Sequence, residues 1–86
     1  MTFTNLGCDP IYLSKVYYYV AQCTSGTISN QLYCIQSGLM TELPNTYWET
    51  LATGPNADYA YWILVKDTCK VIVKMGDYDV TIWKPF

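Results

Sequence analysis

The chain has 86 residues, of which 51% are apolar and 16% aromatic, and its net charge at pH 7 is −2. This length forms one small domain, residues 1–86. Because the sequence contains no arginine and no histidine, it lacks both the basic patch of a nucleic-acid-binding protein and the usual general base of an enzyme.

Residues 1–10 are predicted to form a short strand or an N-terminal arm, which ends at the turn Gly7-Cys8-Asp9-Pro10. This start has no basic region followed by an apolar one, so we expect no secretory signal. The longest apolar run, Tyr59 to Val65, is too short to span a membrane, and we expect no membrane partner.

Two segments in the first half are predicted to be strands of a hairpin, 15–23 with 31–37. The run Tyr17-Tyr18-Tyr19-Val20 favours a strand, although the spacing of Val16, Val20 and Cys23 also fits one face of a helix. The residues Thr24-Ser25-Gly26-Thr27 between the two segments are typical of a turn.

Residues 38–45 are predicted to be a loop, because Pro44 cannot take part in strand pairing. The segment Tyr47 to Ala52 that follows is short, and fits either an edge strand or a turn of helix. A break at residues 53–58 then separates the two halves of the chain.

Residues 59–84 are predicted to be a three-stranded meander with strands at 59–66, 69–75 and 78–84. The pair Gly76-Asp77 fits a two-residue hairpin turn of type II′, which has glycine first. This turn sets a register in which Val73 faces Val80 and Lys74 faces Asp79. The whole chain is therefore expected to be all-β, with antiparallel hairpins arranged as a meander, a small sandwich or an open barrel.

The four cysteines are Cys8, Cys23, Cys34 and Cys69. None of their spacings is typical of a zinc site, and no histidine is present to complete one. The cysteines either form disulfides, whose pairing the sequence leaves open, or remain reduced as small buried side chains, as expected for a chain folded in a cytoplasm.

No motif in the chain indicates a catalytic residue, a cofactor or a metal. The pair Asp77 and Asp79 fits a turn better than a calcium site. Glu42 and Glu49 are not expected to form a catalytic pair, because nothing indicates a cleft between them. The aromatic pair Tyr47 and Trp48 is the better candidate for a binding contact, although Trp48 fits a core residue better than a ligand contact.

The pattern Val16-Tyr17, Leu32-Tyr33-Cys34-Ile35-Gln36, Pro44 and Tyr47-Trp48-Glu49-Thr50-Leu51 resembles a small β-module of bacteriophage virion proteins. These modules are in turn similar to the carbohydrate-binding modules attached to chitinases and cellulases. The resemblance covers residues 11–54, and it implies contact positions at Tyr47, Trp48 and Tyr33.

The resemblance implies a non-catalytic virion protein, a capsid decoration or a head or tail fibre component, that binds copies of itself and other virion proteins. Two alternatives remain open. One is a glycan-binding module that uses exposed aromatic rings, and the other is a small phage inhibitor of a host enzyme. The expected location is the virion, after synthesis in the host cytoplasm.

Overall fold

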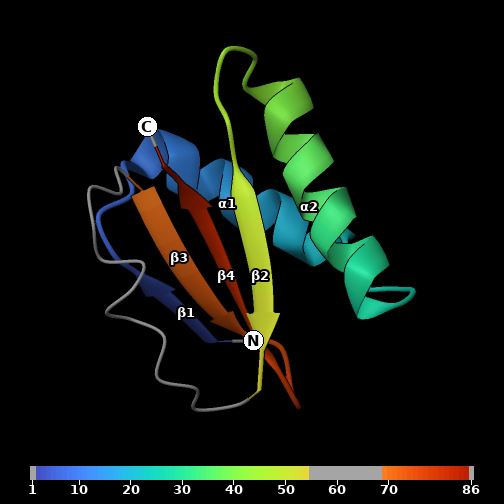
Figure 1. Ribbon diagram of the computed structural model, residues 1–86. Coiled ribbons are helices and arrows are strands. Elements are labelled where there is room, and N and C mark those ends of the chain that lie inside the picture. Colours follow the sequence, from blue (N-terminus) through green and yellow to red (C-terminus); the bar gives the residue numbers. More distant parts are fainter. Residues whose placement is uncertain (1, 55–68, 86) are drawn as a thin grey trace.

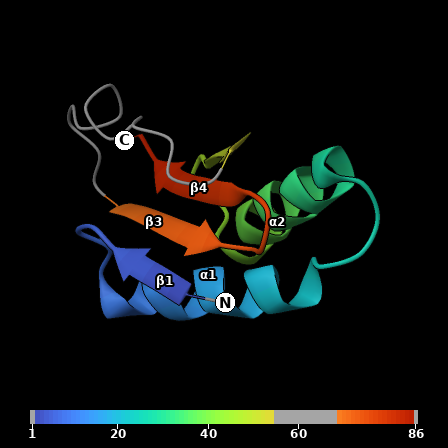
Figure 2. The ribbon, with the colours of Figure 1, turned by 90° about the horizontal axis from the view of Figure 1, so that it is seen from below.

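The computed structural model describes residues 2–54 and 69–85 (Figure 1). In chain order, the elements are β1 (Thr2–Asn5), α1 (Pro10–Gln22), α2 (Ile28–Glu42), β2 (Glu49–Thr53), β3 (Cys69–Lys74) and β4 (Asp79–Lys84). The strands form one antiparallel sheet of four in the order β1-β3-β4-β2. Both helices pack on one face of this sheet, which gives two layers (Figure 2).

The expectation of an all-β fold is wrong, because the segments 15–23 and 31–37 lie mainly in helices and not in strands. In α1 the buried residues are Val16 and Val20, with Cys23 just after the helix, and this is the helical spacing. Tyr17 and Tyr18 are adjacent and both exposed. In a strand, adjacent side chains point to opposite faces of the sheet, so this pair does not follow the pattern of a half-buried strand.

Local signals at the helix ends explain where the helices start and stop. Pro10 occupies the first turn of α1, where its missing N–H leaves no hydrogen bond unmade. Thr27 caps the start of α2, with its Oγ1 accepting a hydrogen bond from the Asn30 N–H at 3.1 Å. At the other end, α2 stops at Glu42, two residues ahead of Pro44.

The predicted hairpin of β3 and β4 is confirmed in its register, with Val73 opposite Val80 and Lys74 opposite Asp79. The carboxylate of Asp79 lies 3.7 Å from Lys74 Nζ. Gly76 has a φ of +100°, which glycine adopts without strain. The third strand of the predicted meander, at 59–66, lies outside the described residues.

The two remaining short strands form the edges of the described sheet. The N-terminal segment forms β1 and pairs with β3, and Glu49–Thr53 forms β2 and pairs with β4. Residues 47–52 were predicted to form either an edge strand or a turn of helix, and most of them lie in the edge strand β2.

The core lies between the sheet and the two helices. The sheet contributes every second side chain of β3 and β4. Because successive side chains of a strand point to opposite faces, these alternate side chains all point to the face that the helices cover. Among the described residues, the fully buried apolar ones, at 0% exposure, are Val16, Val20, Ile35, Leu39, Trp48, Cys69, Val71, Val73, Val80 and Ile82.

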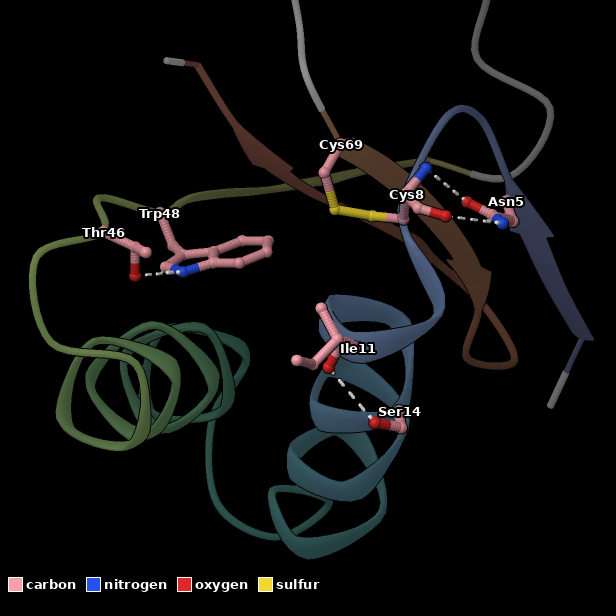
Figure 3. Close-up of a disulfide and its surroundings, with 7 residues drawn as sticks. All are labelled: Asn5, Cys8, Ile11, Ser14, Thr46, Trp48 and Cys69. Atoms are coloured by element: carbon pink, nitrogen blue, oxygen red, sulfur yellow. Dashed lines mark hydrogen bonds between the residues drawn. A yellow bond between two sulfur atoms is a disulfide. The ribbon is translucent and has the colours of Figure 1, made fainter.

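All four cysteines form disulfides, one of the two states that the sequence left open. Cys8, after β1, is bonded to Cys69 at the start of β3 (Figure 3). Cys23, after α1, is bonded to Cys34 in α2. The first disulfide therefore joins the loop between β1 and α1 to the sheet, and the second joins the two helices.

Candidate interaction surface

Trp48 lies between the helices and the sheet and is fully buried. Its indole Nε1 donates a hydrogen bond to Thr46 Oγ1 at 2.9 Å (Figure 3), and its ring makes an edge contact with Tyr12. Its carbonyl accepts a hydrogen bond from Gln36 Nε2 at 2.7 Å. Of the two interpretations of Trp48, the structure therefore shows the core residue, and its ring has no surface for a partner.

Tyr47, next to Trp48, is 37% exposed and precedes β2. A hydrogen bond to the Glu49 carboxylate is the main cause that raises the pKa of Tyr47, and the negative charge of Glu49 and partial burial add to it. The phenol therefore stays protonated at neutral pH. The two predicted neighbours thus differ completely in exposure.

Tyr33 lies on the outer side of α2 and is 71% exposed, the largest value among the large apolar residues of the described part of the chain. It lines a hollow of about 380 Å³, which we call the outer α2 hollow and whose lining residues are Tyr33, Gln36, Ser37, Met40 and Thr41. Neither Tyr47 nor Trp48 lines this hollow, so the three predicted contact residues do not form one site.

A second hollow, of about 410 Å³, lies between the two helices and continues from the first through Ser37 and Thr41. We call it the tyrosine hollow, and its lining residues are Tyr18, Tyr19, Gln22, Cys23, Cys34, Ser37, Gly38 and Thr41. Tyr18 is 54% exposed, and its ring stands at 88° to that of Tyr19 with centroids 5.0 Å apart.

The helices that form the tyrosine hollow are held together in two ways. The Cys23–Cys34 disulfide fixes one end. Beyond the hollow, the Glu42 carboxylate accepts a hydrogen bond from the Tyr19 hydroxyl at 3.5 Å and pairs with Lys15 Nζ at 3.5 Å. Partial burial is the main cause that raises the pKa of Tyr19, and the charge of Glu42 is the second.

Tyrosine rings and neutral polar side chains make up most of the lining of both hollows, together with Met40, Gly38 and the Cys23–Cys34 disulfide. None of the residues that line them carries a charge at neutral pH. Exposed tyrosine rings contribute flat apolar area and a hydroxyl at low entropic cost, because only two torsions are fixed on binding. The arrangement suits an uncharged partner surface, such as a protein patch or a sugar, better than an ionic ligand.

Sequence reasoning identified Tyr33 but missed Tyr18, Gln22 and Met40. The signal that could have found them is helical spacing: Tyr18 and Gln22 are four residues apart and lie on one side of α1. In a strand the two residues would share a face but lie about 13 Å apart, so the strand prediction for 15–23 does not bring them into one site.

In the described part of the chain, 2–54 and 69–85, no group of three metal-binding side chains is found, and neither helix is long and apolar enough to cross a membrane. The chain matches no protein-family model, and comparisons with curated proteins and with solved structures find no significant similarity.

Proposed function

We propose that the chain is a non-catalytic interaction protein that binds a partner through the tyrosine hollow, as a structural component of a phage particle. Within the particle it acts as a capsid decoration or as part of a head or tail fibre. The resemblance of residues 11–54 to phage virion modules supports the setting, although the segments 15–23 and 31–37 are helical.

One observation carries the binding role. The exposed ring of Tyr18 lines the tyrosine hollow, which lies between two helices. A disulfide holds these helices at a fixed separation. A surface that is already ordered loses little conformational entropy when a partner binds, so more of the contact energy appears as affinity.

The two disulfides support a function outside a reducing cytoplasm. Disulfides persist in extracellular and virion surface proteins, and glutathione and thioredoxin keep most cytosolic thiols reduced. A phage particle leaves the host and meets an oxidising environment. The pairing of all four cysteines therefore fits a protein that works on the particle after release.

Mass spectrometry of purified particles tests the proposal. We expect the chain at a fixed, high copy number, and its absence from particles would contradict the virion role. Particles assembled with the variant Tyr18→Ser should contain less of the chain. Ile11→Ser is the matched control, because Ile11 is 67% exposed on α1 but lines neither hollow.

A second candidate function is binding of a neutral glycan. The observation that favours it is the mixture of Tyr18 with Gln22, Ser37 and Thr41 in one hollow, because tyrosine rings stack on sugar faces and amides and hydroxyls bond to sugar hydroxyls. A glycan array with the wild type and Tyr18→Ser separates the two functions. Equal binding by the two proteins would count against the glycan site.

A further inference from the structure

The two disulfides differ in their exposure to solvent. Cys8 and Cys69 are 7% and 0% exposed, and their bond lies where the loop before α1 meets β3 (Figure 3). Cys23 is also buried, at 2%, whereas Cys34, on α2, is exposed. Disulfide exchange begins when a thiolate reaches one of the two sulfur atoms. A thiolate can therefore reach the Cys23–Cys34 bond through Cys34, but it cannot easily reach the other bond.

The accessible disulfide also lines the tyrosine hollow. Cys23 and Cys34 stand in the wall of this hollow beside Gln22, and the residues of the buried disulfide line neither of the two hollows. A small molecule that enters the tyrosine hollow therefore meets a disulfide. A change in this bond also changes the wall of the candidate surface.

The same disulfide ends a row of contacts between α1 and α2. Cys34, Gly38 and Glu42 are four residues apart and so lie on one side of α2. Cys34 is bonded to Cys23, and the backbone of Gly38 lies against the Tyr19 ring. Glu42 accepts a hydrogen bond from the Tyr19 hydroxyl at 3.5 Å. Two non-covalent contacts therefore continue to join the helices if the disulfide opens.

Further contacts should keep the protein folded without this bond. Lys15 Nζ pairs with the Glu42 carboxylate at 3.5 Å, and Gln31 Nε2 donates a hydrogen bond to the Gly26 carbonyl, in the turn between the helices, at 3.1 Å. Both helices also contribute fully buried residues to the core, which are Val16, Val20, Ile35 and Leu39. Opening of the bond should therefore loosen one end of the hollow and leave the fold intact.

We propose that the Cys23–Cys34 disulfide is a redox site that controls the tyrosine hollow. A small thiol such as glutathione, as its thiolate, attacks Cys34 Sγ and forms a mixed disulfide with it. The bond to Cys23 Sγ breaks, and Cys23 leaves as a thiolate that takes a proton from water. A second thiolate attacks the glutathione sulfur and releases Cys34. The two thiols are oxidised to their own disulfide, and the two electrons they lose reduce the protein disulfide.

Reduction should weaken binding at the tyrosine hollow. The end of α1 is then no longer bonded to α2, so Tyr18 and Gln22 lose their fixed positions relative to Ser37. A partner must order this end when it binds, and the cost of that ordering lowers the affinity. This consequence rests on the proposed function, since it takes the hollow as the binding surface. The hollow would bind more tightly after the protein leaves a reducing cytoplasm.

Brief treatment of the disulfide-bonded protein with reduced glutathione tests the site. Iodoacetamide stops the reaction, and peptide mass spectrometry locates each modification. We expect glutathione on Cys34, alkylation of Cys23, and an intact Cys8–Cys69 bond. The accessible bond should open at least about tenfold faster, because a buried bond reacts only during local opening. Equal rates for the two bonds, or glutathione on Cys23, would overturn the inference.

A matched pair of variants tests which sulfur is accessible. Cys23→Ser leaves Cys34 as a free thiol, which should react rapidly with oxidised glutathione. Cys34→Ser leaves the buried Cys23, which should react slowly. Circular dichroism establishes that both variants are folded, and equal rates in two folded variants would contradict access through Cys34. If either variant is unfolded, the modification sites of the wild type decide the matter.

NMR spectroscopy of the protein reduced only at Cys23 and Cys34 tests the effect on the hollow. The ring signals of Tyr18 and Tyr19 should shift, because both rings line the hollow. The backbone amide signals of β3 and β4 should stay in place, since these strands lie outside it. Unchanged tyrosine signals, or loss of the amide pattern of the sheet, would count against a switch within an intact fold.

Particles that lack the chain separate this inference from the proposed function. Binding to them that depends on Tyr18 but is equally tight for the oxidised and the reduced protein would refute the redox control alone. A chain that opens at Cys34 as expected, and yet is absent from purified particles, would refute the virion role alone.

Discussion

The ring of Tyr19 on α1 lies directly against the backbone of Gly38 on α2. A β-carbon on Gly38 would lie 2.4 Å from Tyr19 Cδ1, well inside contact distance. The helices can therefore approach to this separation only because residue 38 has no side chain. Both residues line the tyrosine hollow, so changes at this contact should affect both the stability of the protein and the shape of the hollow.

Gly38→Ala should destabilise the protein, even though alanine is the better helix former by ~1 kcal/mol. Overpacking costs about 1–3 kcal/mol. After the helix-propensity gain is subtracted, we expect a net loss of up to about 2 kcal/mol in the free energy of unfolding, measured by urea denaturation. Gly54→Ala is the control, because among residues 2–54 and 69–85 no atom beyond its chain neighbours lies within 4 Å of the added carbon. Equal stability of the two variants would contradict the close contact.

Trp48→Ala should be far more damaging than Tyr33→Ala. Trp48 is fully buried, and truncation of a core tryptophan costs about 3–5 kcal/mol. Tyr33 is 71% exposed and its truncation should change stability by no more than ~0.5 kcal/mol. Thermal unfolding of both variants followed by circular dichroism makes the comparison. Similar losses for the two would mean that Trp48 does not anchor the core.

The two disulfides should contribute unequally to stability. Their sequence separations are 61 residues for Cys8–Cys69 and 11 for Cys23–Cys34. The chain-entropy relation gives about 4 kcal/mol for the longer loop and about 3 kcal/mol for the shorter. Paired cysteine-to-serine variants, compared by urea denaturation, should show the larger loss for Cys8 and Cys69. The reverse order would argue against a chain-entropy origin.

Tyr47 should titrate above the usual tyrosine pKa of 10.0, because Glu49 hydrogen-bonds to its phenol and repels its anion. Since the folded pKa is raised, the stability from the protonated phenol is fully present below pH 10 and is lost as the pH rises through the folded pKa. Glu49→Gln should lower the Tyr47 midpoint, measured by NMR of the ring carbons. Glu42 contacts Tyr19 and not Tyr47, so Glu42→Gln should leave the pKa of Tyr47 unchanged.

The hairpin of β3 and β4 could be predicted in full because its information is local. The turn at Gly76 sets the register, and each cross-strand pair then follows by counting. The pairing of β1 with β3 could not be predicted, since about 70 residues separate the strands and no turn links them.

The helices were predicted wrongly because two signals in residues 15–23 disagree. The tyrosine run has high strand propensity, but propensity is a weak term beside burial of a continuous apolar stripe. The stripe of Val16 and Val20 packs against the sheet and decides the outcome. The tyrosines are then left on the surface, which is why the candidate site lies on helices and includes residues that sequence reasoning overlooked.

The bond between Cys8 and Cys69 also closes the chain into a ring that contains both helices and β2. A protease that cuts once between residues 8 and 69 therefore opens the ring without separating the protein into two pieces. Both products remain covalently attached, and the sheet retains the strands needed to hold them in register. If the chain is displayed on a particle, as proposed, a single cleavage by a secreted protease would leave its binding surface attached.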